Sequence, residues 1–385
     1  MKIAYVYDVI YPHIKGGAQK RIWELSKRLA TRGHEVTVFG MKHWEGPAII
    51  SRERVRLYGV CSPQELYVNG HRSVKEAVYF SGAVLPHLLK NEFDIIDCQN
   101  FPYFSCFSSK VASVLKGFPL LITWHEVWDS YWSEYLGRRG VFGKIVERLT
   151  TKLAKVNVTG TRHNMQRLVS LGINEDKIKL IPIGGISFSD IERIPSAAES
   201  VDVIFVGRLT KAKGVETLLH SLAYLRSRSS SVQLAIVGDG PERENLQALA
   251  RRLGIYSLVR FLGHIEDDAR VLSIMKSARV FVYPAAPEGG WSLSVVEANA
   301  CGLPAISARS GLIGNNEVVI DGYNGLLTEE ESAEAIAEKI RLLLEHEPLR
   351  QELSRNALNF AKEQDWGNLA TKMEDLYGQV ACKGS

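Results

Sequence analysis

The segment around which the chain is organised, Tyr283 to Cys301, reads Y-P-A-A-P-E-G-G-W-S-L-S-V-V-E-A-N-A-C. The apolar run before it, 280–282, predicts a buried strand, which a Pro/Gly loop and a helix beginning near Ser292 then follow. Because the first N–H groups of a helix are unpaired and partly positive, this loop is a natural seat for a phosphate.

Two glutamates flank the predicted phosphate seat. Glu297 lies about 7 Å along the helix axis, where its carboxylate can accept hydrogen bonds from sugar or ribose hydroxyls. Glu288 lies on the other side of the loop. The alternative interpretation is that Glu297 only complements the helix dipole and that Glu288 is a solvated loop acid.

The same alternation of strand and helix fills both halves of the chain. Near the N-terminus, the apolar run 3–7, a loop containing Gly16 and Gly17, a helix and the strand 36–39 form a βαβ unit, which implies a parallel sheet. The two glycines let the backbone approach a ligand at the carboxyl end of the strand, or they form an ordinary turn.

The length of the chain predicts two domains, because 385 residues exceed what one hydrophobic core usually supports. The Gly184-Gly185 pair and the polar run 187–200 break the pattern, so we expect an N-terminal domain over 1–185 and a second domain over 186–365. The final helix, within 366–385, has an apolar stripe and is expected to pack back onto the first domain.

Composition excludes several classes of protein. No run approaches the roughly 20 apolar residues of a membrane span, and the N-terminal M-K-I-A-Y-V-Y-D predicts a strand rather than a signal peptide. The five cysteines include no C-x-x-C pair, which argues against a disulfide framework or a zinc site. We therefore expect a cytoplasmic protein.

Charge divides unevenly along the chain. Residues 1–185 carry 26 Lys and Arg against 16 Asp and Glu, whereas residues 186–385 carry 21 against 27. The first half is therefore expected to meet something anionic, such as phospholipid, a phosphorylated acceptor or nucleic acid.

A predicted helix over 141–156 has one basic and one apolar face. The basic face holds Lys144, Arg148, Lys152 and Lys155, and the apolar face holds Ile145, Leu149, Leu153 and Val156. Segment 138–156 thus resembles a helix lying on an anionic membrane, which would place the protein peripherally at the inner face. The alternative is a core-packed helix with a solvated basic face.

Three further segments carry candidate site residues. His125 follows the predicted strand 120–123, where it either donates to a sugar hydroxyl, shuttles a proton or serves only the structure. Arg208 and Lys213 flank a tight loop before a helix, and both suit a diphosphate, although surface salt bridges are the alternative. The loop after strand 261–264, with His264, is placed to read a nucleobase through backbone groups. The segment G-D-G-P-E-R at 238–243 lacks the third glycine of a dinucleotide fingerprint.

Together these segments resemble, nearly end to end, the retaining glycosyltransferases of the GT-B group known as family 4, or glycosyl transferases group 1. The likeness rests on the Gly-Gly loop at 16–17, G-R-L-T-K-A-K-G at 207–214, F-L-G-H at 261–264, W-S-L-S-V-V-E-A-N-A-C-G-L-P at 291–304 and D-G-Y-N-G-L-L at 321–327. It implies an α/β fold of two facing, doubly wound, Rossmann-like domains, with a nucleotide-sugar held mainly by the second.

The resemblance also implies roles for particular residues. Arg208 and Lys213 would hold the donor diphosphate, and Glu297 would bind the ribose. The backbone N–H groups of the segment that begins the helix, Trp291, Ser292 and Leu293, would meet the phosphate. One departure is that the family's first glutamate falls at position 289, which is glycine here. Either a bulge in the loop brings Glu288 to the sugar, or backbone groups replace that contact.

The expected reaction is transfer of a hexose from a UDP- or GDP-sugar to a hydroxyl of a glycan, a glycolipid or a small molecule, with the anomeric configuration kept. No cofactor and no metal is expected, because no D-x-D triplet is present to hold a divalent ion on the diphosphate. A nucleotide-sugar epimerase and a non-catalytic sugar-nucleotide binder are the alternatives. Nucleic acid is not an expected partner, because the basic residues lack interleaved aromatics.

Overall fold

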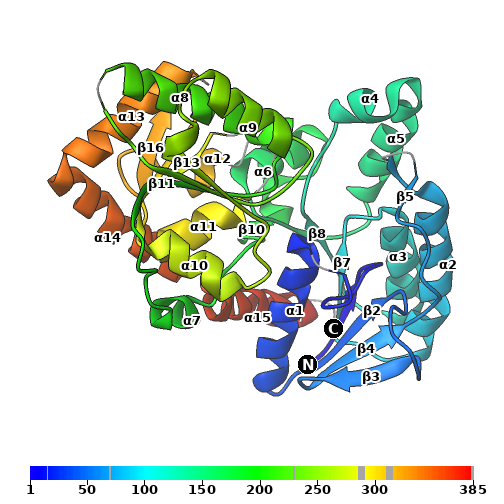
Figure 1. Ribbon diagram of the computed structural model, residues 1–385. Helices are drawn as coiled ribbons and strands as arrows, with labels where there is room; N and C mark the ends of the chain where they lie inside the picture. The colour runs from blue at the N-terminus through cyan, green and yellow to red at the C-terminus, as the bar shows by residue number, and fades with distance from the viewer. Residues whose placement is uncertain are drawn as a thin grey trace. The chain divides into compact units, whose positions relative to one another are not determined.

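The computed structural model describes residues 1–14, 16–68, 71–228, 230–284, 291–308, 315–330 and 332–382. It divides into two compact units (Figure 1). Unit 1 consists of Met1–Gly184 together with the C-terminal segment from Trp366, and unit 2 consists of Gly185–Asp365. The boundary therefore falls within the Gly184-Gly185 pair.

Unit 1 is built on an eight-stranded sheet in the order β10-β9-β8-β7-β1-β2-β4-β3. Its paired strands are parallel except β3 and β4. The strands are β1 (Lys2–Val6), β2 (Glu35–Gly40), β3 (Ile49–Arg52), β4 (Val55–Gly59), β7 (Ile95–Gln99), β8 (Leu120–Trp124), β9 (Val156–Thr159) and β10 (Ile178–Leu180), with β5 (Tyr67–Val68) and β6 (His71–Arg72) paired separately.

Helices cover both faces of this sheet (Figure 1). Because side chains alternate along a strand, Ile3 and Tyr5 of β1 pack with α1 and α15, whereas Ala4 and Val6 pack with α2 and α3. The helices of unit 1 are α1 (Gly17–Thr31), α2 (Val74–Lys90), α3 (Phe104–Lys116), α4 (Tyr131–Leu136), α5 (Gly140–Thr150), α6 (Arg162–Ser170) and α15 (Trp366–Cys382).

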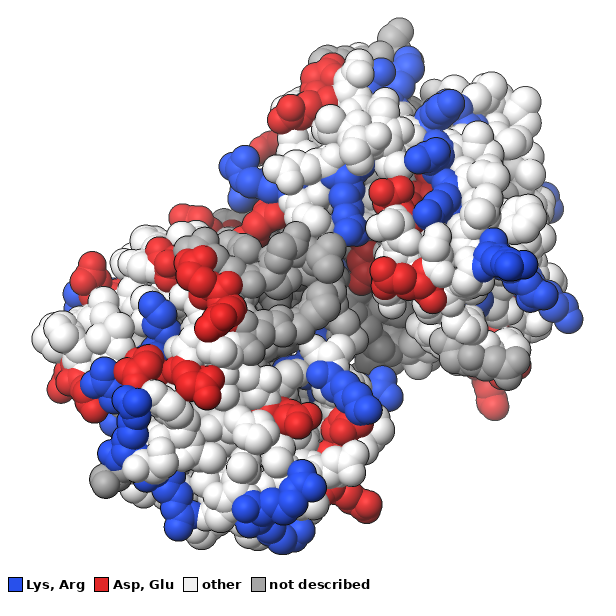
Figure 2. All heavy atoms as spheres, turned by 90° about the horizontal axis from the view of Figure 1, so that it is seen from above, with Lys and Arg blue, Asp and Glu red and all other residues white. Residues whose placement is uncertain are grey.

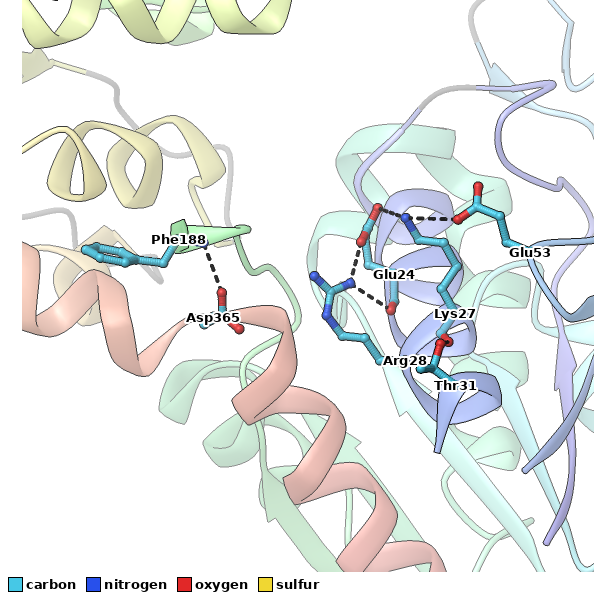
Figure 3. Close-up of polar contacts among 7 residues, drawn as sticks. All are labelled: Glu24, Lys27, Arg28, Thr31, Glu53, Phe188 and Asp365. Atoms are coloured by element: carbon cyan, nitrogen blue, oxygen red, sulfur yellow. Dashed lines mark hydrogen bonds and ion pairs between the residues drawn. The ribbon is translucent and has the colours of Figure 1, made fainter. Parts of the chain in front are cut away.

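Helices α1 and α15 share one face of the sheet and both bury apolar side chains there, and α1 also carries ion pairs. The apolar stripe of α15 lies in the core of unit 1 and consists of Trp366, Leu369, Met373, Leu376 and Tyr377. On α1, an ion-pair cluster joins Glu24 to Arg28 at 2.5 Å and to Lys27 at 3.0 Å (Figure 3). Lys27 also lies 3.7 Å from Glu53 of the neighbouring chain segment. Pairs this accessible stabilise a fold only slightly.

Helix α5 is shorter than the predicted 141–156. It ends at Thr150, where the hydroxyl of Thr150 donates to Val146 O and that of Thr151 donates to Arg148 O. The Thr151 hydroxyl thus occupies the Arg148 carbonyl, which the N–H of residue 152 would use if the helix continued. Val156 then begins β9 and is not part of the helix.

Unit 2 holds a six-stranded, wholly parallel sheet in the order β13-β12-β11-β14-β15-β16. The strands are β11 (Val201–Val206), β12 (Leu234–Val237), β13 (Val259–Gly263), β14 (Ala278–Tyr283), β15 (Ala305–Ala308) and β16 (Gly325–Thr328). The helices are α7 (Phe188–Arg193), α8 (Val215–Ser227), α9 (Arg243–Arg252), α10 (Asp268–Lys276), α11 (Leu293–Ala300), α12 (Asn315–Val318), α13 (Ala333–Glu345) and α14 (Glu347–Glu363).

In unit 2, helices α8 and α13 lie on one side of the sheet, and α10 and α11 lie on the other (Figure 1). Two sheets with helices on both faces, one wholly parallel and the other parallel except for the β3–β4 pair, confirm the predicted α/β, doubly wound class. On the face drawn in Figure 2, the coloured basic and acidic side chains are interspersed and do not form one continuous basic surface.

Candidate functional site

The predicted donor-binding residues of unit 2 gather at one edge of its sheet. Strands β11 and β14 are neighbours and parallel, and they end at Val206 and Tyr283. The loops that follow them therefore leave the sheet at the same carboxyl edge, where open α/β sheets bind ligands.

Lys213 is held at this edge by Tyr283. It ends a short 3₁₀ turn, Lys211–Lys213, and its Nζ donates to Tyr283 Oη at 3.1 Å while lying 5.6 Å from the ring centroid. Gly214 follows with φ of +64°, a left-handed conformation that glycine adopts without strain, and leads into α8. The ammonium group is thus positioned where β11 and β14 end.

The loop that carries Arg208 is supported from the neighbouring strand β12. The Gly207 N–H donates to Val237 O at 3.0 Å, and the Leu209 N–H donates to Asp239 O at 2.9 Å. Gly238, with φ of +135°, lies so close that a Cβ would overlap the Gly207 carbonyl oxygen. This glycine therefore supports the Arg208 loop, a role that the search for a dinucleotide fingerprint did not reveal. The Arg208 side chain itself is exposed.

Helix α11 follows β14 in the chain and begins without a side-chain cap. Ser292 is its N-cap residue, and the Ser292 hydroxyl makes no capping bond but lies 3.3 Å from Ser294 Oγ. Leu293 opens the helix. The first backbone N–H groups are therefore not engaged by a cap and remain suited to an anion.

Buried polar atoms without a partner lie near the same edge. Within the described residues, they include Thr210 Oγ1 in the Arg208 loop, Trp291 Nε1 before α11 and Ser307 Oγ on β15. Ser307 pairs in register with Tyr283. Buried polar groups are normally hydrogen-bonded, so these atoms are exceptions to that rule.

The other predicted site residues of unit 2 lie on different elements and differ in exposure. Glu297 is half-buried on α11, and His264 is exposed after β13. The pKa of the Asp239 carboxyl is lowered by the Gly240 N–H, by Arg243 and, to a smaller extent, by His264, which places His264 near the β12 loop. Glu288 lies outside the described residues.

In unit 1, His125 directly follows β8 and is held by a polar network. Its backbone N–H donates to Asn100 Oδ1 at 3.0 Å, and its Nε2 lies 2.8 Å from Gln99 Oε1. Since Gln99 Nε2 donates to Asp97 Oδ1 at 2.9 Å, the Gln99 oxygen accepts from the imidazole. This network assigns the ring proton to Nε2 and leaves Nδ1 of His125 as an acceptor.

The network continues to the C-terminal helix. Asp97 is fully buried, and besides Gln99 it accepts from Thr123 Oγ1 at 2.8 Å and from Tyr377 Oη at 2.6 Å. Burial raises the pKa of the Asp97 carboxyl, and Arg21 and the three donors oppose that shift. Tyr377 lies on α15, so the C-terminal helix supports the residues that hold His125.

His125 is a neutral imidazole at neutral pH. Burial and the Arg21 guanidinium lower its pKa from 6.5 to about 3. Arg21 is itself fully buried on α1, where its Nη2 donates to Met373 Sδ at 3.5 Å. A ring that resists protonation is better suited to hydrogen bonding than to carrying a proton.

Glu147 of α5 anchors the aromatic segment that follows His125. Its Oε1 accepts from Tyr103 Oη at 2.8 Å and from Trp128 N at 2.9 Å, and its Oε2 accepts from Asp129 N at 2.8 Å. Burial raises the pKa of the Glu147 carboxyl. Sequence reasoning missed this residue, although a single acid in a helix of basic and apolar residues was an available signal.

Gly16 and Gly17 open α1. Gly16 has an extended backbone with φ of −176°, and a Cβ there would meet only the flexible Gln19 side chain. A Cβ on Gly17 would meet no atom within 4 Å. The described structure therefore requires neither glycine, and close approach of a ligand stays the prediction for both.

No helix in the described parts of the chain combines the length and apolar character that crossing a bilayer requires. Within those same ranges, no three His, Cys, Asp or Glu side chains lie together as ligands for a metal ion.

Family models match almost the whole chain. The model for Glycosyltransferase Family 4 matches residues 15–184, and the model for Glycosyl transferases group 1 matches residues 188–360. The chain therefore belongs to the GT-B glycosyltransferases of this family, which confirms the predicted family, fold and enzyme class.

Individual proteins and structures similar to this chain share about a third of its sequence or less. The chain is 31% identical to the uncharacterized glycosyltransferase MJ1069 of Methanocaldococcus jannaschii over 264 residues, which is 64% of each protein and thus less than two thirds of that relative. It is 28% identical to the phosphatidyl-myo-inositol mannosyltransferase of Mycobacterium leprae, with 99% of this chain and 96% of that protein covered. The structure of Anabaena Alr3699/HepE in complex with UDP matches with a TM-score of 0.73, at 20% identity, over 98% of this chain and 100% of that one.

Proposed function

We propose that this glycosyltransferase moves a hexose from a nucleotide diphosphate sugar to an acceptor hydroxyl and keeps the anomeric configuration. The observation that carries the proposal is Lys213, which Tyr283 holds at the carboxyl end of β14, together with the start of α11, which has no side-chain cap. An ammonium group, the nearby Arg208 loop and a partly positive helix start together suit a diphosphate. The related Alr3699/HepE structure contains UDP, which makes UDP-sugars the first donors to test before GDP-sugars.

Charge development explains what these groups contribute to the reaction. When the glycosidic bond to the diphosphate breaks, negative charge grows on the leaving group. Arg208, Lys213 and the N–H groups from Trp291 to Leu293 would stabilise that charge, because they are oriented before the reaction starts. We propose that the reaction needs no metal ion and that the departing phosphate takes the acceptor's proton.

The remaining residues would orient the donor. Glu297, half-buried on α11, would accept the ribose hydroxyls, and the backbone near His264 would contact the base. His125 would accept a hydrogen bond from a sugar hydroxyl at Nδ1, since its Nε2–H is engaged by Gln99. Gly16 and Gly17 would let the backbone approach the donor, and Glu288 would contact the sugar.

The exposed side of α5 supports a lipid-linked acceptor or a glycan made at a membrane. Four of its apolar side chains are accessible: Val141 is 56%, Phe142 71%, Ile145 49% and Leu149 46% exposed, whereas Val146 packs against the core. Basic residues accompany them, namely Arg138, Arg139, Lys144, Arg148 and Lys152. The mannosyltransferase of Mycobacterium leprae is named for phosphatidyl-myo-inositol, a lipid.

We therefore propose peripheral contact between α5 and an anionic bilayer. Inserting an apolar side chain contributes about 1.5–3 kcal/mol, and each nearby cation adds about 1 kcal/mol on anionic lipid. Vesicles with anionic lipid should sediment the protein, and vesicles of phosphatidylcholine alone should bind it much more weakly. The double variant Phe142→Ser/Ile145→Ser should lose this binding, whereas Leu342→Ser, which removes an exposed apolar side chain of unit 2, should not. Equal sedimentation of both variants would contradict the proposal.

The catalytic proposal is tested in two steps. A thermal-shift screen of UDP-, GDP-, ADP- and TDP-sugars identifies the donor, because a ligand that binds only the folded state raises its melting temperature. Nucleotide release is then measured with and without glycan and lipid acceptors. The proposal predicts release that depends on the acceptor and a product with the donor's anomeric configuration. Release without any acceptor, or a product of inverted configuration, would contradict it.

A further inference from the structure

A cavity of about 560 Å³ opens in unit 2 at the edge of the sheet away from the donor loops. Its wall includes Ala278 and Arg279 at the start of β14 and Ala300 and Cys301 at the end of α11. Both elements reach the candidate donor site with their other ends, since β14 finishes at Tyr283 and α11 begins after Ser292. Six residues of strand span roughly 20 Å, so a nucleotide at the donor loops would not fill this cavity.

Basic side chains outnumber acidic ones in the lining of this cavity. Among the described residues that line it, four are basic, Lys276, Arg279, Arg350 and Lys362, and one is acidic, Glu192. This local excess of basic residues contrasts with the second half of the chain as a whole, because residues 186–385 hold 21 Lys and Arg against 27 Asp and Glu. A local excess of positive charge in an acidic unit indicates an anion as the occupant.

The two arginines are fixed side by side by the end of α13. Arg279 Nη2 donates to Leu344 O at 3.0 Å, and Arg350 Nη1 donates to Leu343 O at 3.0 Å. Both guanidinium groups therefore cap one helix terminus, which is a structural role in its own right. A guanidinium has five N–H groups, so capping leaves further donors on each arginine.

Nearby acids only partly offset these charges. Asp202 Oδ1 lies 3.3 Å from Arg279 Nη1, and Glu347 lies 3.7 Å from Arg350 with most of its side chain exposed. Burial and then the charge of Arg279 lower the pKa of Arg350, and Glu347 opposes the shift. Two like charges held together at a half-buried site are stabilised when an anion binds between them.

The lysines complete the wall. Lys276 Nζ donates to Glu192 O at 3.0 Å and to Ile194 O at 2.8 Å, which fixes it after α7. Lys362 Nζ lies 5.3 Å from the centre of the Phe188 ring. The Phe188 N–H donates to Asp365 Oδ2 at 2.9 Å, and its ring extends away from that carboxylate (Figure 3).

We propose that this cavity binds a small phosphate ester. Fixed guanidinium and ammonium groups would bind the phosphate oxygens, and the apolar part of the wall, formed by Phe188, Leu303 and Leu358, would contact the organic group. The volume lies within the range of about 300–1,000 Å³ found for small-molecule sites. The site is separate from the donor loops and does not depend on the reaction proposed above.

Glycerol 3-phosphate is a suitable probe, with glycerol and matched sodium chloride as controls. Binding is measured by calorimetry on the Arg208→Ala/Lys213→Met double variant, so that the candidate donor site does not contribute. We expect binding of glycerol 3-phosphate but not of glycerol. Arg350→Gln should weaken it at least tenfold, whereas Arg355→Gln, which removes an exposed cation from the same helix, should leave it unchanged.

Because Arg350→Gln also removes a cap from the end of α13, a second variant tests the charge of the cavity with both arginines in place. Gln351→Glu adds a negative charge to the lining without removing either arginine and should weaken binding several-fold. Circular dichroism confirms that each variant is folded. Failure of glycerol 3-phosphate to bind, or equal binding by Arg350→Gln, Gln351→Glu and Arg355→Gln, would overturn the proposal.

Discussion

Acid should destabilise this protein through His125. Its pKa is about 3 in the folded chain and 6.5 when unperturbed, chiefly because the ring is buried and secondly because Arg21 is near. Between these values the unfolded chain binds a proton that the folded chain excludes. The free energy of unfolding therefore falls as the pH drops below 6.5, by up to about 1.4 kcal/mol per pH unit.

At pH 5 this reasoning gives at most about 2 kcal/mol. Since His125 as a whole residue is only partly buried, we expect a loss of about 1–2 kcal/mol relative to neutral pH. The perturbation is His125→Gln, which removes the titrating group, and His220→Gln at an exposed position of α8 is the control.

Urea unfolding of the three proteins near neutral pH and near pH 5 measures this effect. The stability advantage of wild type over His125→Gln should shrink by about 1–2 kcal/mol on acidification, and no such change should separate wild type from His220→Gln. An NMR titration should find the His125 ring still neutral at pH 5, with its proton on Nε2. A ring that protonates near pH 6.5, or a stability difference that does not vary with pH, would refute the reasoning.

Three further predictions concern other parts of the same framework. Lys213→Met should weaken nucleotide binding roughly 10- to 100-fold by removing a charged donor, while Lys211→Met in the same turn should not; equal thermal shifts for both would count against the diphosphate seat. Tyr377→Phe removes one of three donors to buried Asp97 and should lower the free energy of unfolding by about 1.5–3 kcal/mol. Urea unfolding measures this loss, and an unchanged midpoint would contradict the prediction. Gly238→Ala should destabilise the protein by more than about 1 kcal/mol through strain and overlap, and a neutral effect would show that the Arg208 loop tolerates displacement.

The features that the sequence predicted well depend on local order along the chain. In a strand–loop–helix unit, the loop lies at the carboxyl edge of the parallel sheet. This holds whichever strands of the chain pair with that strand. This rule correctly indicated the strand that ends at Tyr283 and the helix that begins after Ser292. It also identified His125 as a residue at the end of a strand.

The features that the sequence did not predict depend on contacts between distant segments. Tyr377 and Asp97 are 280 residues apart, and no pattern in either segment indicates that one holds the other. Likewise, an alternation of apolar and basic residues in α5 does not reveal whether the apolar face is covered. The structure leaves Ile145 and Leu149 about half exposed, whereas Leu153 and Val156 of the same predicted face pack against the core.

The central claim is that unit 2 binds the donor diphosphate where Lys213 and the start of α11 meet. The most direct measurement is the position of the diphosphate in a crystal of the protein with the nucleotide identified by thermal shift. We predict phosphate oxygens within about 3.2 Å of Lys213 Nζ and of the first backbone N–H groups of α11. A diphosphate bound elsewhere, including the cavity at Arg279 and Arg350, would contradict the account.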